Sequence, residues 1–164
     1  MKLQEIMVRE VIQVSPDDSV GEAAKRMQEK SVGCLVATAD GAVKGIITDR
    51  DLVACLHQEH NPYECKVAVH MSRPVIVLRP EEDHITALDV MQKKRIKRLP
   101  IAMGGKLLGI VSLSDLASVA ECEEEKLWPS RTFITDLIRT QAARGRGATR
   151  RTQVGENVPA KTVA

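Results

Sequence analysis

The chain contains one segment twice, and this duplication constrains its fold more than any other feature of the sequence. Residues 7–52 align without gaps on residues 71–116, at a constant offset of 64. A single unit of this size buries its own core poorly, so we expect the two copies to pack face to face with related clefts between them. The matched positions are Met7/Met71, Val11-Ile12/Val75-Ile76, Pro16/Pro80, Met27-Gln28/Met91-Gln92, Leu35/Leu99, Gly41/Gly105, Gly45-Ile46/Gly109-Ile110 and Asp51-Leu52/Asp115-Leu116.

Composition limits the size and the chemistry of the core. A chain of 164 residues accommodates one compact domain of about 120–130 residues and a tail. Trp, Tyr and Phe occur once each, so the core must consist of aliphatic side chains and methionine. The tail is basic, because residues 131–164 carry seven Lys or Arg and two acidic residues, whereas residues 1–130 carry seventeen and twenty.

The sequence favours a cytoplasmic protein with reduced cysteines. No apolar stretch reaches the length of about 18 residues that crosses a membrane, and the first residues lack the profile of a secretory signal. The four cysteines form no CxxC pair, and their irregular spacing differs from that of a disulfide framework. We therefore expect reduced, mostly buried thiols at Cys34, Cys55, Cys65 and Cys122.

Each copy predicts the order strand, helix, strand, strand, helix. In the first copy, Val11–Val14 predicts a strand, and Ser15-Pro16-Asp17-Asp18 is a helix start with proline in the first turn. Apolar residues then recur at helical spacing as far as Met27. Asp40-Gly41 predicts a hairpin turn between two further strands, and a second helix is expected from Asp49 to about His57.

The second copy repeats this order. Its strands are expected at Val75–Leu78, Leu99–Met103 and Leu107–Val111, with a last helix from Leu113 to about Lys126. Before it, Val67 to His70 predicts a short helical turn. The fold class is α/β, more strictly α+β: duplicated β-α-β-β-α units with two small sheets, packed as a pseudo-two-fold pair.

Domain boundaries follow from the repeat. We expect the first repeat at residues 3–60 and the second at 66–126. The C-terminal extension, 127–164, is expected to contain an amphipathic helix over 130–143. Residues 144–164 have too few apolar side chains to fold and are expected to be disordered.

Each copy ends its last strand with a hydroxyl residue and places an aspartate three positions later. These pairs are Thr48 with Asp51 and Ser112 with Asp115. The pattern is that of a capping box, in which hydroxyl and carboxylate satisfy free amides at a helix start. A helix N-terminus with a hydroxyl also suits a phosphate, and a carboxylate one turn later can accept both hydroxyls of a ribose. Both roles are compatible.

Taken together, these motifs resemble a known family. The duplicated unit carries GIITDRDL and GIVSLSDL at its two helix starts, with VIVLRPEE and RLPI in the second copy. It is similar to a tandem cystathionine-β-synthase (CBS) domain pair, or Bateman module, over about residues 3–125. The resemblance implies a non-catalytic regulatory module whose inter-repeat clefts bind an adenine nucleotide (AMP, ADP or ATP) or, less often, S-adenosylmethionine or NAD.

The resemblance also implies which residues hold the ligand. The aspartates bind ribose, the hydroxyls lie near phosphate, the first strand of each copy walls the base, and a basic residue before Leu-Pro reaches the phosphates. The matching positions are Val11, Ile12, Thr48, Arg50, Asp51, Val75, Ile76, Lys97, Arg98, Pro100, Ser112 and Asp115. Because the counterpart of Arg98 is Cys34, which carries no cation, we expect two unequal clefts.

Two other clusters have simpler explanations. Cys55, His57, His60 and Cys65 are metal-ligand types within eleven residues, but their spacing matches no zinc pattern, so we expect no metal site. In the basic run Lys93–Arg98, the first three cations suit a helix C-terminus, where they offset the negative end of the dipole.

No enzyme signature is present, so we expect no catalytic activity. The chain has no nucleophile elbow, P-loop or Gly-rich dinucleotide loop. We expect a homodimer that signals to an unknown downstream protein, without a membrane partner. Two alternatives stay open: a dimerisation scaffold with empty clefts, and a nucleic-acid-associated protein that uses the Arg144–Gly147 and Arg150-Arg151 segments of the tail.

Overall fold

The computed structural model describes residues 1–57 and 61–122, without the side chains of 120–122. The chain divides into a unit of residues 1–127 and a second of residues 128–164. Within the described residues the elements are α1 (Leu3–Ile6), β1 (Gln13–Val14), α2 (Val20–Glu29), β2 (Cys34–Ala39), β3 (Ala42–Thr48), α3 (Asp49–His57), α4 (Val67–His70), α5 (His84–Lys94), β4 (Arg98–Met103), β5 (Lys106–Ser112) and α6 (Leu113–Cys122). The expected helix at 130–143 and disorder at 144–164 lie outside this range. None of the helices described is long and apolar enough to traverse a bilayer.

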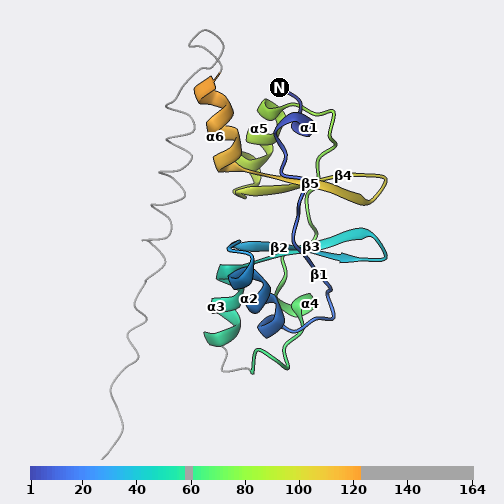
Figure 1. Cartoon of the computed structure of the whole chain (residues 1–164), viewed down its shortest axis with the longest axis vertical. Coiled ribbons are helices and arrows are strands. Elements are labelled where there is room, and N and C mark those ends of the chain that lie inside the picture. The colour runs from blue at the N-terminus through green and yellow to red at the C-terminus, as the bar shows by residue number, and fades with distance from the viewer. Residues whose placement is uncertain (58–60, 123–164) are drawn as a thin grey trace, which may run out of the picture. The chain divides into compact units, whose positions relative to one another are not determined.

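Two β-hairpins with their helices form the two halves of the fold. Strands β2 and β3 pair antiparallel, as do β4 and β5. Figure 1 shows the hairpins stacked, with α2 and α3 on the outer side of one and α5 and α6 on the outer side of the other. The sheet order is β1-β2-β3-β5-β4, but β3 meets β5 at the single pair Ala42 and Lys106. The strands thus form one five-stranded sheet and not the two small sheets expected, because this single pair joins the two hairpins.

The duplication extends to the helix ends. Ser19 caps α2 by accepting a hydrogen bond from the amide of Glu22 at 3.0 Å, and Asp83 caps α5 by accepting one from the amide of Thr86 at 2.7 Å. Ser31 and Arg95, which follow these helices, both adopt the left-handed conformation, with φ of 52° and 59°. The matched sequence positions thus have matched backbone geometry.

The core is aliphatic in both halves, as the composition predicts. Buried side chains occupy the same register positions in each copy, which explains why the two units adopt one fold. The matched buried pairs are Val14/Leu78, Met27/Met91, Leu35/Leu99 and Ile47/Val111.

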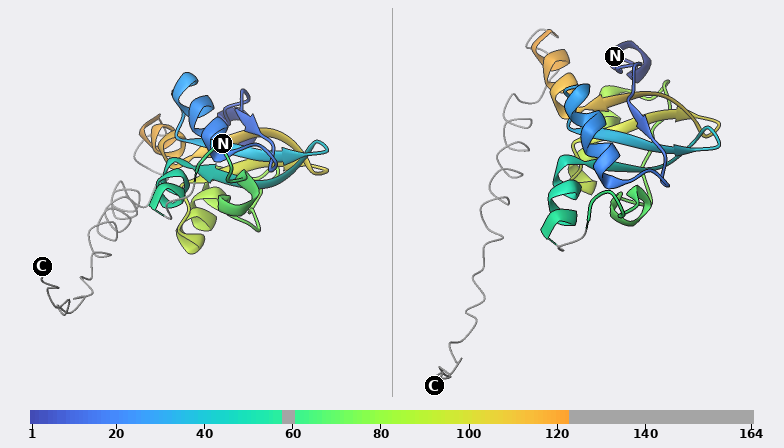
Figure 2. Two further views of the ribbon diagram at one scale, coloured as in Figure 1. Left: turned by 90° about the horizontal axis from the view of Figure 1, so that it is seen from below. Right: turned by 60° about the horizontal axis from the view of Figure 1, so that its bottom comes forward.

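The short helix before each repeat packs on the opposite half. The amide of Leu3 in α1 donates to the carbonyl of Glu82 at 2.8 Å, and α1 lies against α6 and β5. The amide of Val67 in α4 donates to the carbonyl of Asp18 at 2.9 Å, and α4 lies against α2, α3 and β3. Figure 2 shows α1 and α4 beside the halves that they complete. Neither half is complete without a segment from the other.

A methionine and a glycine anchor each exchanged segment. A Cβ built on Gly109 would lie 2.6 Å from Sδ of Met7, and one built on Gly45 would lie 2.6 Å from Sδ of Met71. The backbone therefore needs glycine here, because any side chain would collide with the thioether. This reciprocal contact explains why Met7/Met71 and Gly45/Gly109 recur in both copies.

The first strand differs between the halves. Strand β1 forms over Gln13–Val14, two residues shorter at its start than expected, and the predicted strand at Val75–Leu78 is wrong: only Leu78 forms a bridge, to Ile101. In the first half, the amide of Val36 donates to the carbonyl of Ile12 at 3.2 Å. The counterpart of Val36 is Pro100, which has no amide hydrogen, so the corresponding pairing is lost.

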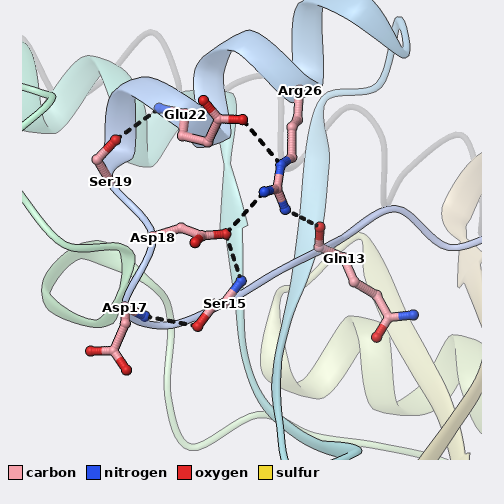
Figure 3. A network of polar contacts seen from close by, with 7 residues as sticks. All are labelled: Gln13, Ser15, Asp17, Asp18, Ser19, Glu22 and Arg26. Carbon is pink, nitrogen blue, oxygen red and sulfur yellow. Dashed lines mark hydrogen bonds and ion pairs between the residues drawn. The ribbon is translucent and has the colours of Figure 1, made fainter.

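In the first half, a polar network ties α2 and the residues before it to β1 (Figure 3). Arg26 donates through Nη1 to the carbonyl of Gln13 at 3.1 Å and pairs through Nη2 with Asp18 at 3.3 Å and through Nε with Glu22 at 3.5 Å. Asp18 also accepts from the amide of Ser15 at 3.0 Å. The counterpart of Arg26 in α5 is Val90, which cannot form such a network.

Candidate functional site

The carboxylate half of the predicted capping box forms at the starts of both α3 and α6, and at α6 the amide of Asp115 also donates to the hydroxyl of Ser112 at 3.3 Å. Oδ2 of Asp51 accepts from the amide and from the hydroxyl of Thr48, each at 2.8 Å. Oδ2 of Asp115 accepts from the amide of Ser112 at 2.7 Å and from its hydroxyl at 2.6 Å. These contacts hold each strand end on the following helix, so the aspartates have a structural role in both halves.

The capping geometry leaves a second function open to the same carboxylates. All hydrogen bonds that Asp51 and Asp115 accept within residues 1–57 and 61–122 go to Oδ2, and both side chains are half-buried. Oδ1 of each aspartate therefore retains its acceptor capacity. A fixed carboxylate with a free oxygen suits recognition of a hydroxyl pair.

Arg98 connects the two halves. Its backbone lies in β4, opposite Ser112 of β5, in the second half. Its guanidinium lies against the first half: a Cβ built on Gly33 would be 3.4 Å from Nη2 of Arg98 and 3.4 Å from Oδ2 of Asp49. The cation thus lies close to the first residue of α3, two positions before Asp51.

Cys34, the register counterpart of Arg98, belongs to the same group of side chains. Burial raises the pKa of the Cys34 thiol, while the neighbouring Arg98 lowers it and Asp49 raises it. The net pKa is above the ordinary value, so Cys34 stays protonated at neutral pH and adds no charge. The charges in this group are those of Arg98 and Asp49.

The remaining predicted positions differ in exposure. Val11, Ile12, Val75 and Ile76 are half-buried, Pro100 is buried, and Arg50 and Lys97 are exposed. The carbonyl of Lys97 accepts from the amide of Leu113 at 2.9 Å, and its counterpart Gly33 accepts from the amide of Asp49 at 3.3 Å. Both strand starts are thereby held against a helix start.

Asp49 and Gly33 were missed by the sequence reasoning. Gly33 has no side chain, which leaves room for the guanidinium of Arg98. Asp49 directly precedes the Arg50-Asp51 motif, but its counterpart is Leu113, so the internal repeat gave no signal for it. The available sequence signal was that the first residue of α3 is acidic, whereas the first residue of α6 is not.

The cysteines and histidines that could bind a metal form a different group in the structure from the one that their sequence spacing suggests. Among the described residues, Cys55 and Cys65 lie together with His70, all ligand atoms within 4.8 Å of one another. His57 is exposed and outside this group, and His60 is outside the described residues. Burial raises the pKa of the Cys55 thiol, and the adjacent Cys65 raises it further.

Comparison with known proteins identifies the family. The sequence matches the CBS domain family over residues 3–58 and again over 66–121. It is 32% identical to the CBS domain-containing protein YhcV of Bacillus subtilis over 115 residues, 70% of this chain and 82% of that protein. It is also similar to the solved structure of a hexameric CBS-CP12 protein from bloom-forming cyanobacteria, with 30% identity, a TM-score of 0.68, and coverage of 90% of this chain and 85% of that one.

A third likeness extends to the fold alone. The CBS domain pair of the protein MJ0100, solved with 5′-methylthioadenosine and S-adenosyl-L-methionine, is 23% identical with a TM-score of 0.69, and the match covers 76% of this chain and 98% of that one. Three observations point to the same duplicated fold: the element order, the reciprocal exchange of α1 and α4, and the two family matches. The chain belongs to the CBS domain family and contains a tandem pair of its repeats.

Proposed function

We propose that this chain is a regulatory module that binds an adenine nucleotide between its two CBS repeats and signals through its conformation or dimer geometry. The observation that carries the proposal is the position of Arg98. Its guanidinium, from the second repeat, lies at the start of α3 in the first, close to Asp49. A ligand bound there contacts both repeats and can change how they sit on each other.

The groups at this point match the parts of a nucleotide. The guanidinium can make bidentate contacts to a phosphate. The free Oδ1 of Asp51 can accept from ribose hydroxyls, while Oδ2 stays engaged with Thr48. The half-buried Val11, Ile12, Val75 and Ile76 offer apolar surface to a base.

The adenosine part of the proposal has support from the MJ0100 domain pair, which was solved with two adenosine compounds. Neither compound carries a phosphate. Arg98 is the reason to favour a ligand with phosphate, such as AMP, ADP or ATP, over S-adenosylmethionine, because an ionic contact to phosphate is stronger than a neutral hydrogen bond. The module itself needs no catalytic group, and we propose that it is a sensor and not an enzyme.

Calorimetry with AMP and with adenosine tests the role of Arg98. The substitution Arg98→Ala is expected to weaken AMP binding by about 1.5–3 kcal/mol and to leave adenosine binding nearly unchanged, because only AMP loses a charged contact. Lys94→Ala, which removes an exposed cation at the end of α5, is the matched control. Equal losses for the two ligands would show that Arg98 acts through packing, and no binding to the intact protein would contradict the proposal.

A double variant tests the ribose contacts. Asp51→Ala with Asp115→Ala is expected to weaken both AMP and adenosine by about 1–3 kcal/mol, since both ligands carry the ribose. These aspartates also cap helices, so thermal melts must show that the variant is folded. Unchanged affinity in a folded double variant would rule out the ribose assignment.

We further propose that the module is a two-fold symmetric homodimer. Large apolar side chains remain exposed on α3 and α5: Val53 is 65%, Leu56 59% and Ile85 58% exposed. Such residues on helix faces favour association. The CBS-CP12 relative is hexameric, which supports assembly in this family. Light scattering measures the mass in solution, and a monomer at tens of micromolar would contradict the proposal.

A further inference from the structure

Three side chains with soft or borderline ligand atoms meet at the junction of α3 and α4. Cys55 lies on α3, Cys65 precedes α4 by two residues, and His70 is the last residue of α4. One ligand atom from each lies within 4.8 Å of the other two. The trio therefore joins a helix of the first repeat to the short helix that precedes the second.

The burial of these groups leaves a polar atom unsatisfied. Cys55 is fully buried, and Cys65 and His70 are half-buried. Nε2 of His70 is itself buried and has no hydrogen-bond partner within the described part of the chain. A buried nitrogen without a partner is destabilising and calls for an explanation, such as a bound ion.

We propose that Cys55, Cys65 and His70 form a binding site for one zinc ion. Zn–S bonds of about 2.3 Å and Zn–N bonds of about 2.0–2.1 Å at tetrahedral angles put ligand atoms about 3.5–3.8 Å apart. The three atoms, already within 4.8 Å of each other, need to close by at most about 1.0–1.3 Å to reach that spacing. Thiolate and imidazole are the ligand types that zinc prefers in proteins.

Charge is balanced at such a site. On binding, each thiol releases its proton to solvent, and the two resulting thiolates neutralise the dication. His70 stays neutral and donates a ring-nitrogen lone pair. Because three protein ligands leave one tetrahedral position open, a water molecule completes the coordination.

The other repeat shows that the fold does not require these residues. At the offset of 64, the counterparts of Cys55, Cys65 and His70 are Val119, Met1 and Ile6. The matched positions on and beside α6 and α1 thus carry apolar residues. The two cysteines and the histidine are a local addition to the first half.

A disulfide is the competing explanation. It would join Cys55 to Cys65, but both are free thiols in this structure. A disulfide would also leave Nε2 of His70 buried without a partner. A metal ion uses all three groups, which is why the observations favour it. The inference is independent of nucleotide binding at Arg98.

Cobalt substitution in the full-length, reduced, metal-free protein tests the site. Titration with Co²⁺ is expected to give thiolate-to-metal charge-transfer absorption and tetrahedral d–d bands that saturate at one ion per chain, and Zn²⁺ should abolish both. Cys65→Ser and His70→Ile, the latter carrying the residue of the other repeat, are expected to lose these signals. Cys34→Ser, which removes a thiol outside the trio, should retain them.

A thermal melt provides the second measurement. Saturating Zn²⁺ is expected to raise the melting temperature of the intact protein and of Cys34→Ser, but not of Cys65→Ser or His70→Ile. The melts also show whether each variant is folded before titration. The proposal is overturned by an intact, folded protein without thiolate charge-transfer absorption, by unchanged signals in both trio variants, or by protein isolated with Cys55 and Cys65 already disulfide-bonded.

Discussion

The two repeats share a backbone and a core but differ in their polar side chains. Most buried positions carry aliphatic residues or methionine in both halves. At other matched positions the copies differ: the first repeat has Arg26, Cys34, Asp49, Cys55 and Gly33 where the second has Val90, Arg98, Leu113, Val119 and Lys97. The fold therefore depends on what the copies have in common, and the chemistry depends on where they have diverged.

The divergence concentrates opposite charges at one point between the halves. Arg98 comes from the second repeat and Asp49 from the first, and both lie against Gly33. The counterparts of these three residues are Cys34, Leu113 and Lys97, of which only the exposed Lys97 carries a charge. The inequality of two clefts related by the pseudo-two-fold axis, expected because Cys34 stands where the other copy has Arg98, stays a prediction.

The largest expected effect comes from matched core substitutions, which test whether the two halves contribute equally to the free energy of unfolding. Leu35→Ala and Leu99→Ala each remove a fully buried side chain and are expected to lower the free energy of unfolding by about 2–5 kcal/mol. Because α1 and α4 are exchanged, both variants are expected to unfold in a single transition, measured by urea denaturation. Two separate transitions, or a small cost in one repeat only, would show that the halves fold independently.

The next prediction concerns the exchanged segments themselves. Gly45→Ala and Gly109→Ala are each expected to lower the free energy of unfolding by about 1–3 kcal/mol, because the new methyl group meets a methionine. Adding Met71→Ala to Gly45→Ala should recover part of the loss, since it removes the colliding thioether. A Gly45→Ala variant as stable as the original protein would contradict the close contact.

Much of the fold follows from the sequence because both the repeat and the helix caps are local signals. The helix Asp49–His57, the turn Val67–His70 and the hairpins were predicted correctly. The strand at Val75–Leu78 was predicted wrongly, because its pairing depends on an amide that Pro100, distant in sequence, does not have.

The candidate site was harder to predict for the same reason. The capping pairs are three residues apart and can be recognised in one copy, and the repeat draws attention to Arg98. Contacts such as Arg98 with Gly33 and Cys55 with His70 join segments that meet only when the halves pack. Sequence spacing alone grouped Cys55 with His57, which the structure leaves exposed elsewhere.

A smaller effect is expected from the charge opposite Arg98. Asp49 is exposed and lies close to the guanidinium of Arg98, so its carboxylate would compete with the phosphate of the proposed ligand. Asp49→Leu, which places the residue of the second repeat in the first, is expected to strengthen AMP binding by about 0.2–1 kcal/mol, with less gain at high salt. Calorimetry at two salt concentrations measures this gain. An equal gain for adenosine, or weaker AMP binding, would show that Asp49 does not act through the phosphate contact.

An effect of similar size is expected from the caps of the two equivalent helices, Ser19 on α2 and Asp83 on α5. The backbone hydrogen bond from Thr86 holds the pKa of Asp83 below its ordinary value of 3.8. A carboxyl group with a lowered pKa stabilises the folded state above pH 3.8, and that contribution is lost as the pH falls through the lower, folded-state pKa.

Asp83→Ser gives the second repeat the cap of the first, which does not titrate. Because a carboxylate also favours the positive end of the helix dipole, the original protein is expected to exceed the variant in stability by about 0.3–1 kcal/mol at neutral pH. That difference should shrink toward zero below pH 3.8. Urea denaturation of both proteins across this range measures it, with Ser19→Asp as the reverse exchange. A difference that stays constant with pH would show that the two caps differ in packing and not in charge.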